Sequence, residues 1–329
     1  MKYWLTSLIL AAPLPALATC VDVPAPPVSL SFESRYKDND LSRSEIDPQA
    51  EADAKAALKV LDDFISDLAT RSDAALLVGD GAEAACIMDA LVHWAEADAL
   101  SVLATPTVQL TIGSRLAALA LITRKVAPIS SPEHTAVVSA WLARRMKEQM
   151  TFWERAPNGA AQGNLRAWSA LAGTATALLT HDPIMLGWSA WSVEYVACTA
   201  NEDGSLPQEM SRKTRALHYQ LHAVAPLTLA AAMLEENGIS MLDRCGQALD
   251  RIVTFTMDDL NAGGIASAEH AGAEQTLNGG LDGVKDFQLA WGEAWLSLRD
   301  QASLETALSE RRPLKYSKLG GDQTRIWAE

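Results

Sequence analysis

Residues 48–72 read "PQAEADAKAALKVLDDFISDLATRS" and contain the pattern on which the fold prediction rests. Leu58, Leu61, Phe64 and Leu68 recur at intervals of three and four residues, so they lie on one face of an α-helix. Most of the positions between them carry charged or polar side chains. The stretch therefore predicts an amphipathic helix with one buried face.

The same spacing recurs along the chain, and strand signals are scarce. It appears at residues 82–100, 107–126, 132–153, 164–180, 184–200, 212–236, 239–257 and 283–299. Short turns rich in Gly, Pro, Asp and Ser separate these segments. Helices of similar length with short connections favour antiparallel αα-hairpins, and their repetition predicts an all-α barrel or toroid. The Gly-rich, aperiodic stretch 258–284 is expected to be a long loop that lines or covers a site.

The N-terminus predicts export. Residues 1–18 have an early Lys2, an apolar middle and the small-residue triplet Ala16-Leu17-Ala18, which together are typical of a cleaved signal peptide. Acylation of Cys20, as in a lipoprotein, is an alternative. No later apolar run reaches the length of a membrane span. The remaining residues, 19–329, show no low-complexity linker and are expected to form one domain.

The four cysteines, Cys20, Cys86, Cys198 and Cys245, belong to a chain expected in an oxidising compartment. They allow three pairings, and sequence alone does not choose among them. Buried free thiols remain an alternative for Cys198 and Cys245. No spacing of Cys and His indicates a metal site.

The net charge of −14 argues against a nucleic-acid partner, whose phosphates need a basic surface. It does not exclude a polyanionic substrate, because a cleft can carry local positive charge. Most of the ten Trp are expected in the core. One or two, from those on helical stripes, are candidates for stacking on sugar rings.

One segment gathers cations against this acidic background. Residues 202–227 read "EDGSLPQEMSRKTRALHYQLHAVAPL". On a helix starting near Arg212, one face would carry Arg215, His218, Tyr219 and His222. This is either a solvated or capping cluster, or the wall of a cleft in which Arg215 holds an anion and a His or Tyr moves a proton.

Several stretches resemble the periplasmic alginate lyases, polysaccharide lyase family 5. "GSLPQEMSRKTRALHYQLHAVAPL" is similar to the family pattern G-F-L-P-N-E-[LM]-x-R-[KR]-x-R-A-L-x-Y-H-N-Y-A-L-x-P-L. The likeness extends to "SLSFESRYKDNDLSRS" at 29–44, "EAACIMDALVHWAEADAL" at 83–100, the helix that begins "GNLRAWS" at 163, and "YSKLGGDQTRIW" at 316–327. It covers about residues 20–329.

The resemblance implies an incomplete α/α toroid with a tunnel-like cleft for an anionic polyuronate. Alginate or polymannuronate is the leading candidate for that polymer. It implies a periplasmic location and β-elimination without metal or cofactor. In such a reaction Asn and Arg neutralise the C6 carboxylate, a base removes the C5 proton and an acid protonates the departing O4. The family uses a His after the Asn and a Tyr seven residues after the Arg.

Carried onto this sequence, the resemblance keeps Asn164, Arg215, Tyr219 and Tyr36 and changes three positions. Leu165 replaces the family His, His222 replaces the family Tyr, and Arg35 replaces a Lys. The implied catalytic residues are His222, Tyr219, Arg215 and Asn164. The implied substrate-binding residues are Arg35, Tyr36, Arg212, His218 and Arg325.

His222 is predicted to transfer the proton, since an imidazole titrates near neutral pH. A buried or merely binding His222 is the alternative. The resemblance also implies a Cys20–Cys86 disulfide, because both cysteines fall in matching segments. Three functions follow: an active polyuronate lyase, a non-catalytic polyuronate-binding protein, or a structural protein of envelope polysaccharide assembly.

Overall fold

The helix expected over residues 48–72 forms as α1, Pro48–Val78, and both of its ends have a physical cause. Asp47 caps the N-terminus, since its side chain accepts hydrogen bonds from the backbone N–H groups of Gln49 and Ala50. Gly79 ends the helix with a φ of 66°, a conformation that glycine adopts without steric cost. The computed structural model describes residues 20–327, so the predicted signal peptide, residues 1–18, lies outside the described residues.

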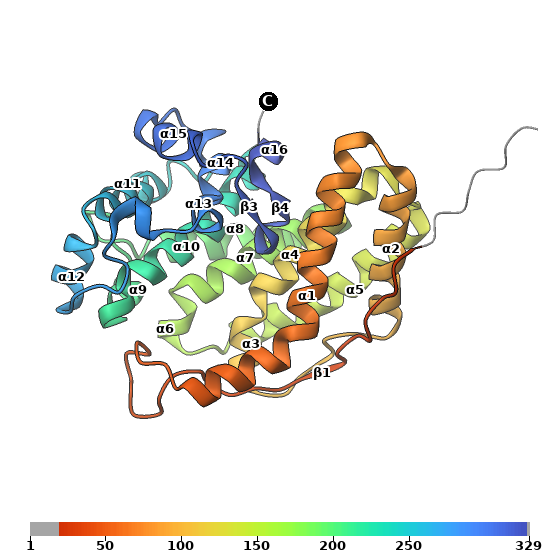
Figure 1. Ribbon diagram of the computed structural model, residues 1–329, viewed down its shortest axis with the longest axis horizontal. Helices are drawn as coiled ribbons and strands as arrows, with labels where there is room; N and C mark the ends of the chain where they lie inside the picture. The colour runs from red at the N-terminus through yellow and green to blue at the C-terminus, as the bar shows by residue number, and fades with distance from the viewer. Residues whose placement is uncertain (1–19, 328–329) are drawn as a thin grey trace, which may run out of the picture.

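Among residues 20–327, nine helices, all long except α14 (Trp291–Leu296), form two rows (Figure 1). The inner row, in order of contact, is α1, α4 (Gly113–Val126), α7 (Asn164–Thr180), α10 (Ala216–Glu236) and α14. The outer row is α2 (Gly81–Glu96), α5 (Pro132–Trp153), α8 (Pro183–Ala197) and α11 (Ala248–Asn261). Each of the first four inner helices packs against the outer helix that follows it, so the unit of construction is the αα-hairpin. The all-α prediction is confirmed.

Shorter elements connect these rows. The short helices are α3 (Pro106–Thr111), α6 (Asn158–Ala161), α9 (Pro207–Met210), α12 (Ile265–Ala271), α13 (Asp286–Leu289), α15 (Ala302–Ser309) and α16 (Gln323–Trp327). The 3₁₀ turns are η1 (Ala127–Ile129), η2 (Lys213–Arg215), η3 (Gly280–Gly283) and η4 (Ser317–Leu319). Two small strand pairs complete the list: parallel β1 (Ser29–Leu30) with β2 (Val102–Leu103), and antiparallel β3 (Lys315–Tyr316) with β4 (Gly321–Asp322).

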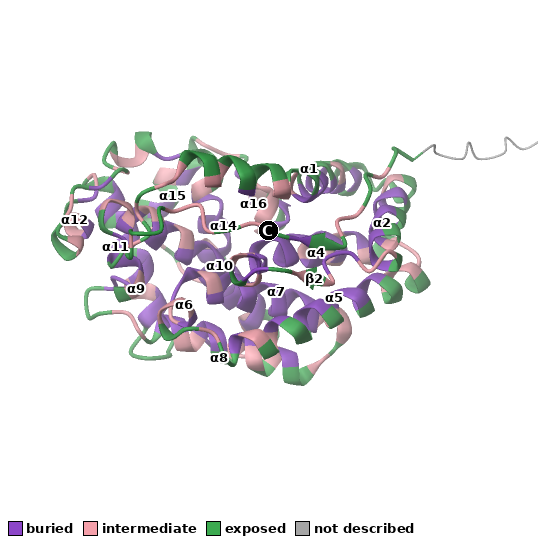
Figure 2. Cartoon of the chain, turned by 90° about the horizontal axis from the view of Figure 1, so that it is seen from below, coloured by how far each residue is buried: buried purple, intermediate pink, exposed green. Residues whose placement is uncertain are grey.

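The core lies between the two rows, where α4, α7 and α10 are buried along most of their length (Figure 2). Small side chains let these helices approach closely. A Cβ on Gly173 of α7, for example, would lie 2.3 Å from the Ser189 hydroxyl oxygen of α8. Large rings fill the remaining space, and the fully buried Trp are Trp94, Trp141, Trp168, Trp291 and Trp295. None of the helices among residues 20–327 is long and apolar enough to cross a membrane.

One predicted helix, over residues 239–257, is displaced toward the C-terminus. α11 begins only at Ala248, because Cys245, Gly246 and Gln247 all have positive φ and no helix passes through such residues. The apolar spacing before residue 248 therefore belongs to a run of turns that packs on the core.

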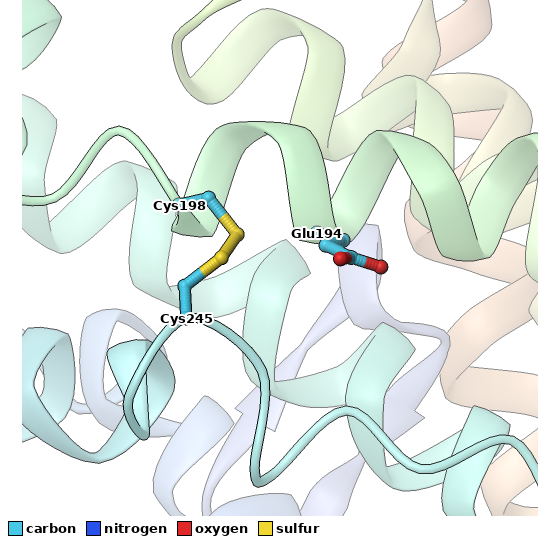
Figure 3. A group of neighbouring side chains, drawn as sticks. All are labelled: Glu194, Cys198 and Cys245. Carbon is cyan, nitrogen blue, oxygen red and sulfur yellow. A yellow bond between two sulfur atoms is a disulfide. The ribbon is translucent and has the colours of Figure 1, made fainter.

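Two disulfides tie the outer row to its connections. Cys20–Cys86 is present, which confirms the prediction from the resemblance and leaves the Cys20 sulfur unavailable for acylation. Cys198–Cys245 joins the end of α8 to the turn before α11, so the free-thiol alternative for these two is wrong. Glu194 lies close to this pair (Figure 3). Because both sulfurs are bonded to each other, this cluster offers no thiolate to a metal.

Removal of either disulfide is expected to destabilise the protein. The bridges close loops with sequence separations of 66 and 47 residues. On the chain-entropy argument each is worth about 4 kcal/mol. The paired variants Cys20→Ser/Cys86→Ser and Cys198→Ser/Cys245→Ser should each lower the free energy of unfolding toward that amount in urea titrations. An unchanged unfolding midpoint in either pair would contradict the expectation.

Candidate active site

A cavity of about 590 Å³ opens where three inner helices begin. Arg115, Asn164 and His218 lie in the first turns of α4, α7 and α10 and all line it. The first half of α1, the segment before it and α3 supply most of the remaining wall, together with Arg212 and Lys318 of η4. Because helix N-termini carry partial positive charge, this arrangement favours an anionic ligand.

The cavity is locally cationic in an acidic protein. Seven Lys and Arg side chains line it against four carboxylates. Three of those carboxylates are already paired, since Asp62 accepts two bonds from Arg115 at 2.8 Å, Asp63 binds Lys59 and Glu51 lies 3.5 Å from Lys55. The cations left without a carboxylate partner among residues 20–327 are Arg35, Arg43, Arg212 and Lys318.

Tyr219 lies at the centre of this charge. Tyr219 is 5% exposed, and its hydroxyl accepts a hydrogen bond of 3.1 Å from Nη2 of Arg35. The guanidinium of Arg212 lies over the ring, with Cζ 4.8 Å from its centroid. Arg35 also donates to the Tyr36 hydroxyl, from Nε at 3.2 Å and Nη2 at 3.0 Å. Two guanidinium groups therefore stabilise negative charge on the Tyr219 oxygen when it gives up its proton.

Asn164 is held in place by a buried carboxylate. Glu209 accepts the Asn164 backbone N–H at 2.7 Å and its side-chain N–H at 2.9 Å, and so caps the start of α7. Gly163 makes this approach possible, because a Cβ there would lie 2.6 Å from Glu209 Oε1. Burial raises the pKa of Glu209, and Arg212 and Asn164 oppose that shift.

Two polar atoms beside Glu209 are left for a ligand. Nε of Arg212 and Oδ1 of Asn164 are buried without a partner among residues 20–327. A buried donor or acceptor without a hydrogen bond costs free energy. A ligand carrying a carboxylate and hydroxyl groups would satisfy both atoms.

The two imidazoles of α10 are neutral in this cavity. Nε2 of His222 accepts a hydrogen bond of 3.0 Å from the Trp168 indole, so its one acceptor nitrogen is occupied. Burial, with a contribution from Lys318, holds the pKa of His222 well below its usual range. Burial, with Arg215 and Arg35, lowers the pKa of His218 to about 4.

Comparison with known proteins decides the family. The profile described as "Alginate lyase" matches residues 25–264, well over half of the chain. The chain belongs to the alginate lyase family. Among curated relatives, an alginate lyase of Pseudomonas syringae pv. syringae (strain B728a) is 26% identical over 321 residues, covering 94% of this chain and 83% of that protein. A polysaccharide lyase of Stenotrophomonas maltophilia (strain K279a) is 28% identical over 324 residues, covering 96% and 92%.

Solved structures of the same family share the fold. A variant of alginate lyase A1-III complexed with a tetrasaccharide superposes with a TM-score of 0.81 at 21% identity, covering 97% of this chain and 88% of that one. Alginate lyase A1-III from Sphingomonas species A1 gives 0.77 at 20% identity, covering 94% and 86%. The predicted α/α toroid is thereby confirmed.

The structure brings most of the residues predicted for the alginate lyase site to one cavity and leaves two outside. Those that line it are Arg35, Tyr36, Asn164, Arg212, His218, Tyr219 and His222. Arg215 does not line it, because residues 213–215 form the 3₁₀ turn η2 and α10 begins only at Ala216. The expectation that Arg215 shares one helical face with His218, Tyr219 and His222 is therefore wrong. Arg325 lies elsewhere and donates to the Asp73 backbone oxygen at 3.0 Å.

This geometry changes the correspondence with the family's Arg and Tyr, which lie seven residues apart. The spacing fits Arg215 with His222, and it fits Arg212 with Tyr219 equally well. Only the second pair is in contact and wholly within the cavity wall. We therefore assign the family Arg to Arg212 and the family Tyr to Tyr219. Leu165, in place of the family His, also lines the cavity.

Sequence reasoning missed four residues of the site: Arg115, Trp168, Glu209 and Lys318. Glu209 and Lys318 stand inside motifs that resemble the family, yet no spacing rule marks them. The stretch 258–284, expected to line or cover a site, contributes nothing to this cavity. It packs instead on η2, where Gln275 donates to the Lys213 backbone oxygen at 2.9 Å. The segment that closes the cavity is the one before α1.

The depressed imidazole pKa values predict a loss of stability in acid. Below pH ~6.5 the unfolded chain protonates both histidines while the folded protein keeps them neutral, so protons favour unfolding. His218 alone should account for about 2 kcal/mol between pH ~7.5 and pH ~5. The His218→Gln variant should therefore lose less stability than the unmodified protein over that interval in urea titrations. Equal losses would contradict the buried, neutral imidazole.

Proposed function

We propose that this protein is a polysaccharide lyase that cleaves alginate by β-elimination, with polymannuronate as its preferred substrate. The proposal rests on the surroundings of Tyr219 in the cationic cavity. Its hydroxyl accepts a hydrogen bond from Arg35, the Arg212 guanidinium lies over its ring, and Asn164 lines the same cavity. Family membership and the tetrasaccharide bound to the similar structure support the same class of ligand.

The proposed reaction needs one proton carrier. Arg212 and the free N–H of Asn164 hold the C6 carboxylate and stabilise the charge that forms on it. Tyr219, deprotonated with help from Arg35, takes the C5 proton. The C4–C5 double bond then forms as the C4–O4 bond breaks, and Tyr219 returns the proton to O4. Atoms balance without water, and the product ends in a C4–C5 unsaturated uronate.

We propose that no metal takes part, because side chains supply the positive charge at the carboxylate. Arg35, Arg212 and Lys318 all line the cavity without a carboxylate partner among residues 20–327. A chelator added to the assay should accordingly leave the rate unchanged.

One residue, Leu165, supports a second function, the binding of a polyuronate without cleavage. Leu165 stands beside Asn164 in the cavity wall where the family carries an imidazole, and leucine cannot move a proton. A protein that binds a polyuronate without cleaving it would retain Arg212, Asn164 and Arg35 for that purpose. We favour the lyase because Tyr219 is present with its two guanidinium partners.

We also propose that the protein acts in the periplasm. The predicted signal peptide and two disulfides, Cys20–Cys86 and Cys198–Cys245, support an oxidising compartment.

The test is a panel of mannuronate-rich, guluronate-rich, glucuronan and pectate polymers. Ultraviolet absorbance of the unsaturated uronate reports elimination directly. An absorbance rise that is fastest with the mannuronate-rich polymer supports the proposal. Binding to that polymer in calorimetry without any absorbance change would favour the non-catalytic alternative.

A further inference from the structure

Lys318 is placed in the cavity by a turn that depends on two glycines. It lies in η4, and the following Gly320 and Gly321 have φ of 86° and 120°. A Cβ on Gly321 would lie 2.5 Å from Asp73 Oδ1 of α1, so this close approach requires glycine. Asp73 then accepts the Asp322 backbone N–H at 2.9 Å, which fixes the turn against α1.

Lys125, whose side chain is 7% exposed, shows what a structural lysine does in this fold. Lys125 binds Asp73 Oδ1 at 2.5 Å and the Gly320 backbone oxygen at 2.6 Å. Its charge is therefore compensated within the protein. Lys318, only two residues from Gly320, makes no ion pair and no side-chain hydrogen bond with any residue among 20–327.

The groups that face Lys318 come from four elements and are mostly positive or neutral. Arg115 of α4 and Arg35 of the N-terminal segment oppose its charge, and Asp62 of α1 favours it. Asp62, however, is committed to Arg115 through two bonds of 2.8 Å. His222 of α10, neutral, completes the surroundings. Burial first, then Arg115, lowers the pKa of Lys318 to about 8.

Lys318 is half-buried in the cavity wall, and an ammonium there without an anion is costly, so the missing anion is expected from a ligand. The other cations near the reaction centre already have contacts, since Arg35 donates to Tyr36 and Tyr219 and Arg212 covers the Tyr219 ring. Lys318 lies near His222, which is hydrogen-bonded to Trp168. The two rings are about one helical turn further along their helices than Tyr219 and Asn164. Lys318 therefore faces a different part of the ligand.

We propose that Lys318 binds the carboxylate of the sugar residue next to the one that reacts, and so makes a neighbouring uronate a requirement for tight binding. The inference rests on the proposed polyuronate ligand. It assigns Lys318 a role in substrate selection and no proton transfer.

Binding is measured by calorimetry with mannuronate oligosaccharides, in a Tyr219→Phe parent that does not consume them. Lys318→Met keeps the length of the side chain and removes the charge. It should weaken binding about 10- to 100-fold, the loss of one charge-assisted hydrogen bond. The matched control is Lys315→Met, whose side chain is 58% exposed and pairs with Asp322 outside the cavity. It should change affinity less than about twofold.

Two further readouts separate binding from structure. Affinity of the parent should fall as the pH rises through about 8, where Lys318 loses its charge, and Lys318→Arg should remove that fall. Without ligand, Lys318→Met should melt no lower than the parent, because it removes a half-buried charge that has no partner.

Equal affinity of Lys318→Met and the parent, or a pH dependence that persists in Lys318→Arg, would overturn the inference. A parent that binds no uronate oligosaccharide would contradict the proposed function itself.

Discussion

Tyr219→Phe is expected to slow elimination of polymannuronate by about 10²- to 10⁴-fold, the range for loss of a general acid–base group. The variant removes one oxygen, which accepts a 3.1 Å bond from Arg35, and leaves the ring under Arg212. Oligosaccharide binding should therefore change little while kcat falls. Initial rates of ultraviolet absorbance and calorimetric binding give the two quantities separately.

Tyr36→Phe is the matched control, because the Tyr36 hydroxyl accepts from the same guanidinium at 3.0 and 3.2 Å. If Tyr219 acts only by holding Arg35, both variants should lose similar activity. We expect Tyr36→Phe to lose less than about tenfold, as removal of a neutral hydrogen-bonding group does. A Tyr219→Phe variant with near-normal kcat, together with an inactive His222→Ala, would restore His222 as the proton carrier.

Arg212→Ala is expected to lower kcat/KM by about 10²- to 10³-fold, whereas Arg215→Ala should change it less than about threefold. Arg212 is 8% exposed, lines the cavity and lies over Tyr219, while Arg215 ends a 3₁₀ turn outside it. The loss of Arg212 also removes the cation that favours the charged form of Glu209. Glu209 is the group that orients Asn164.

The two arginines are three residues apart in the same segment, so each variant controls for the other. Melting temperatures of both establish that the fold survives. The reverse order, with Arg215→Ala inactive and Arg212→Ala active, would contradict the assignment and support the register that the sequence alone suggested.

The helices could be predicted because their signals are local. The stripe through Leu61 and Leu68 and the turn residues at the ends of α1 depend only on neighbours in the chain. The start of α10 could not be predicted, since η2 is held by Gln275, some sixty residues away, which accepts from the Leu217 N–H and donates to the Lys213 oxygen. That contact holds the turn between Arg212, which lines the cavity, and Arg215, which does not.

The site was predictable only where the motif was continuous. Asn164, His218, Tyr219 and His222 were found because two helices bear them in recognisable stretches. The role of Lys318 was not visible, because it depends on Asp73 binding a turn 249 residues away and on Arg115 occupying Asp62. The Trp168–His222 hydrogen bond, which occupies the acceptor nitrogen of His222, is likewise a contact between distant segments.

The replacement of the family His by Leu165 makes the elimination itself the claim to test. An oligomannuronate of defined length should be digested with the unmodified protein, and the fragments weighed by mass spectrometry. Elimination predicts fragments whose masses sum to that of the substrate, one of them bearing the ultraviolet absorbance of the unsaturated uronate. Fragments whose masses together exceed the substrate by one water, or a substrate left intact although it binds, would contradict the account.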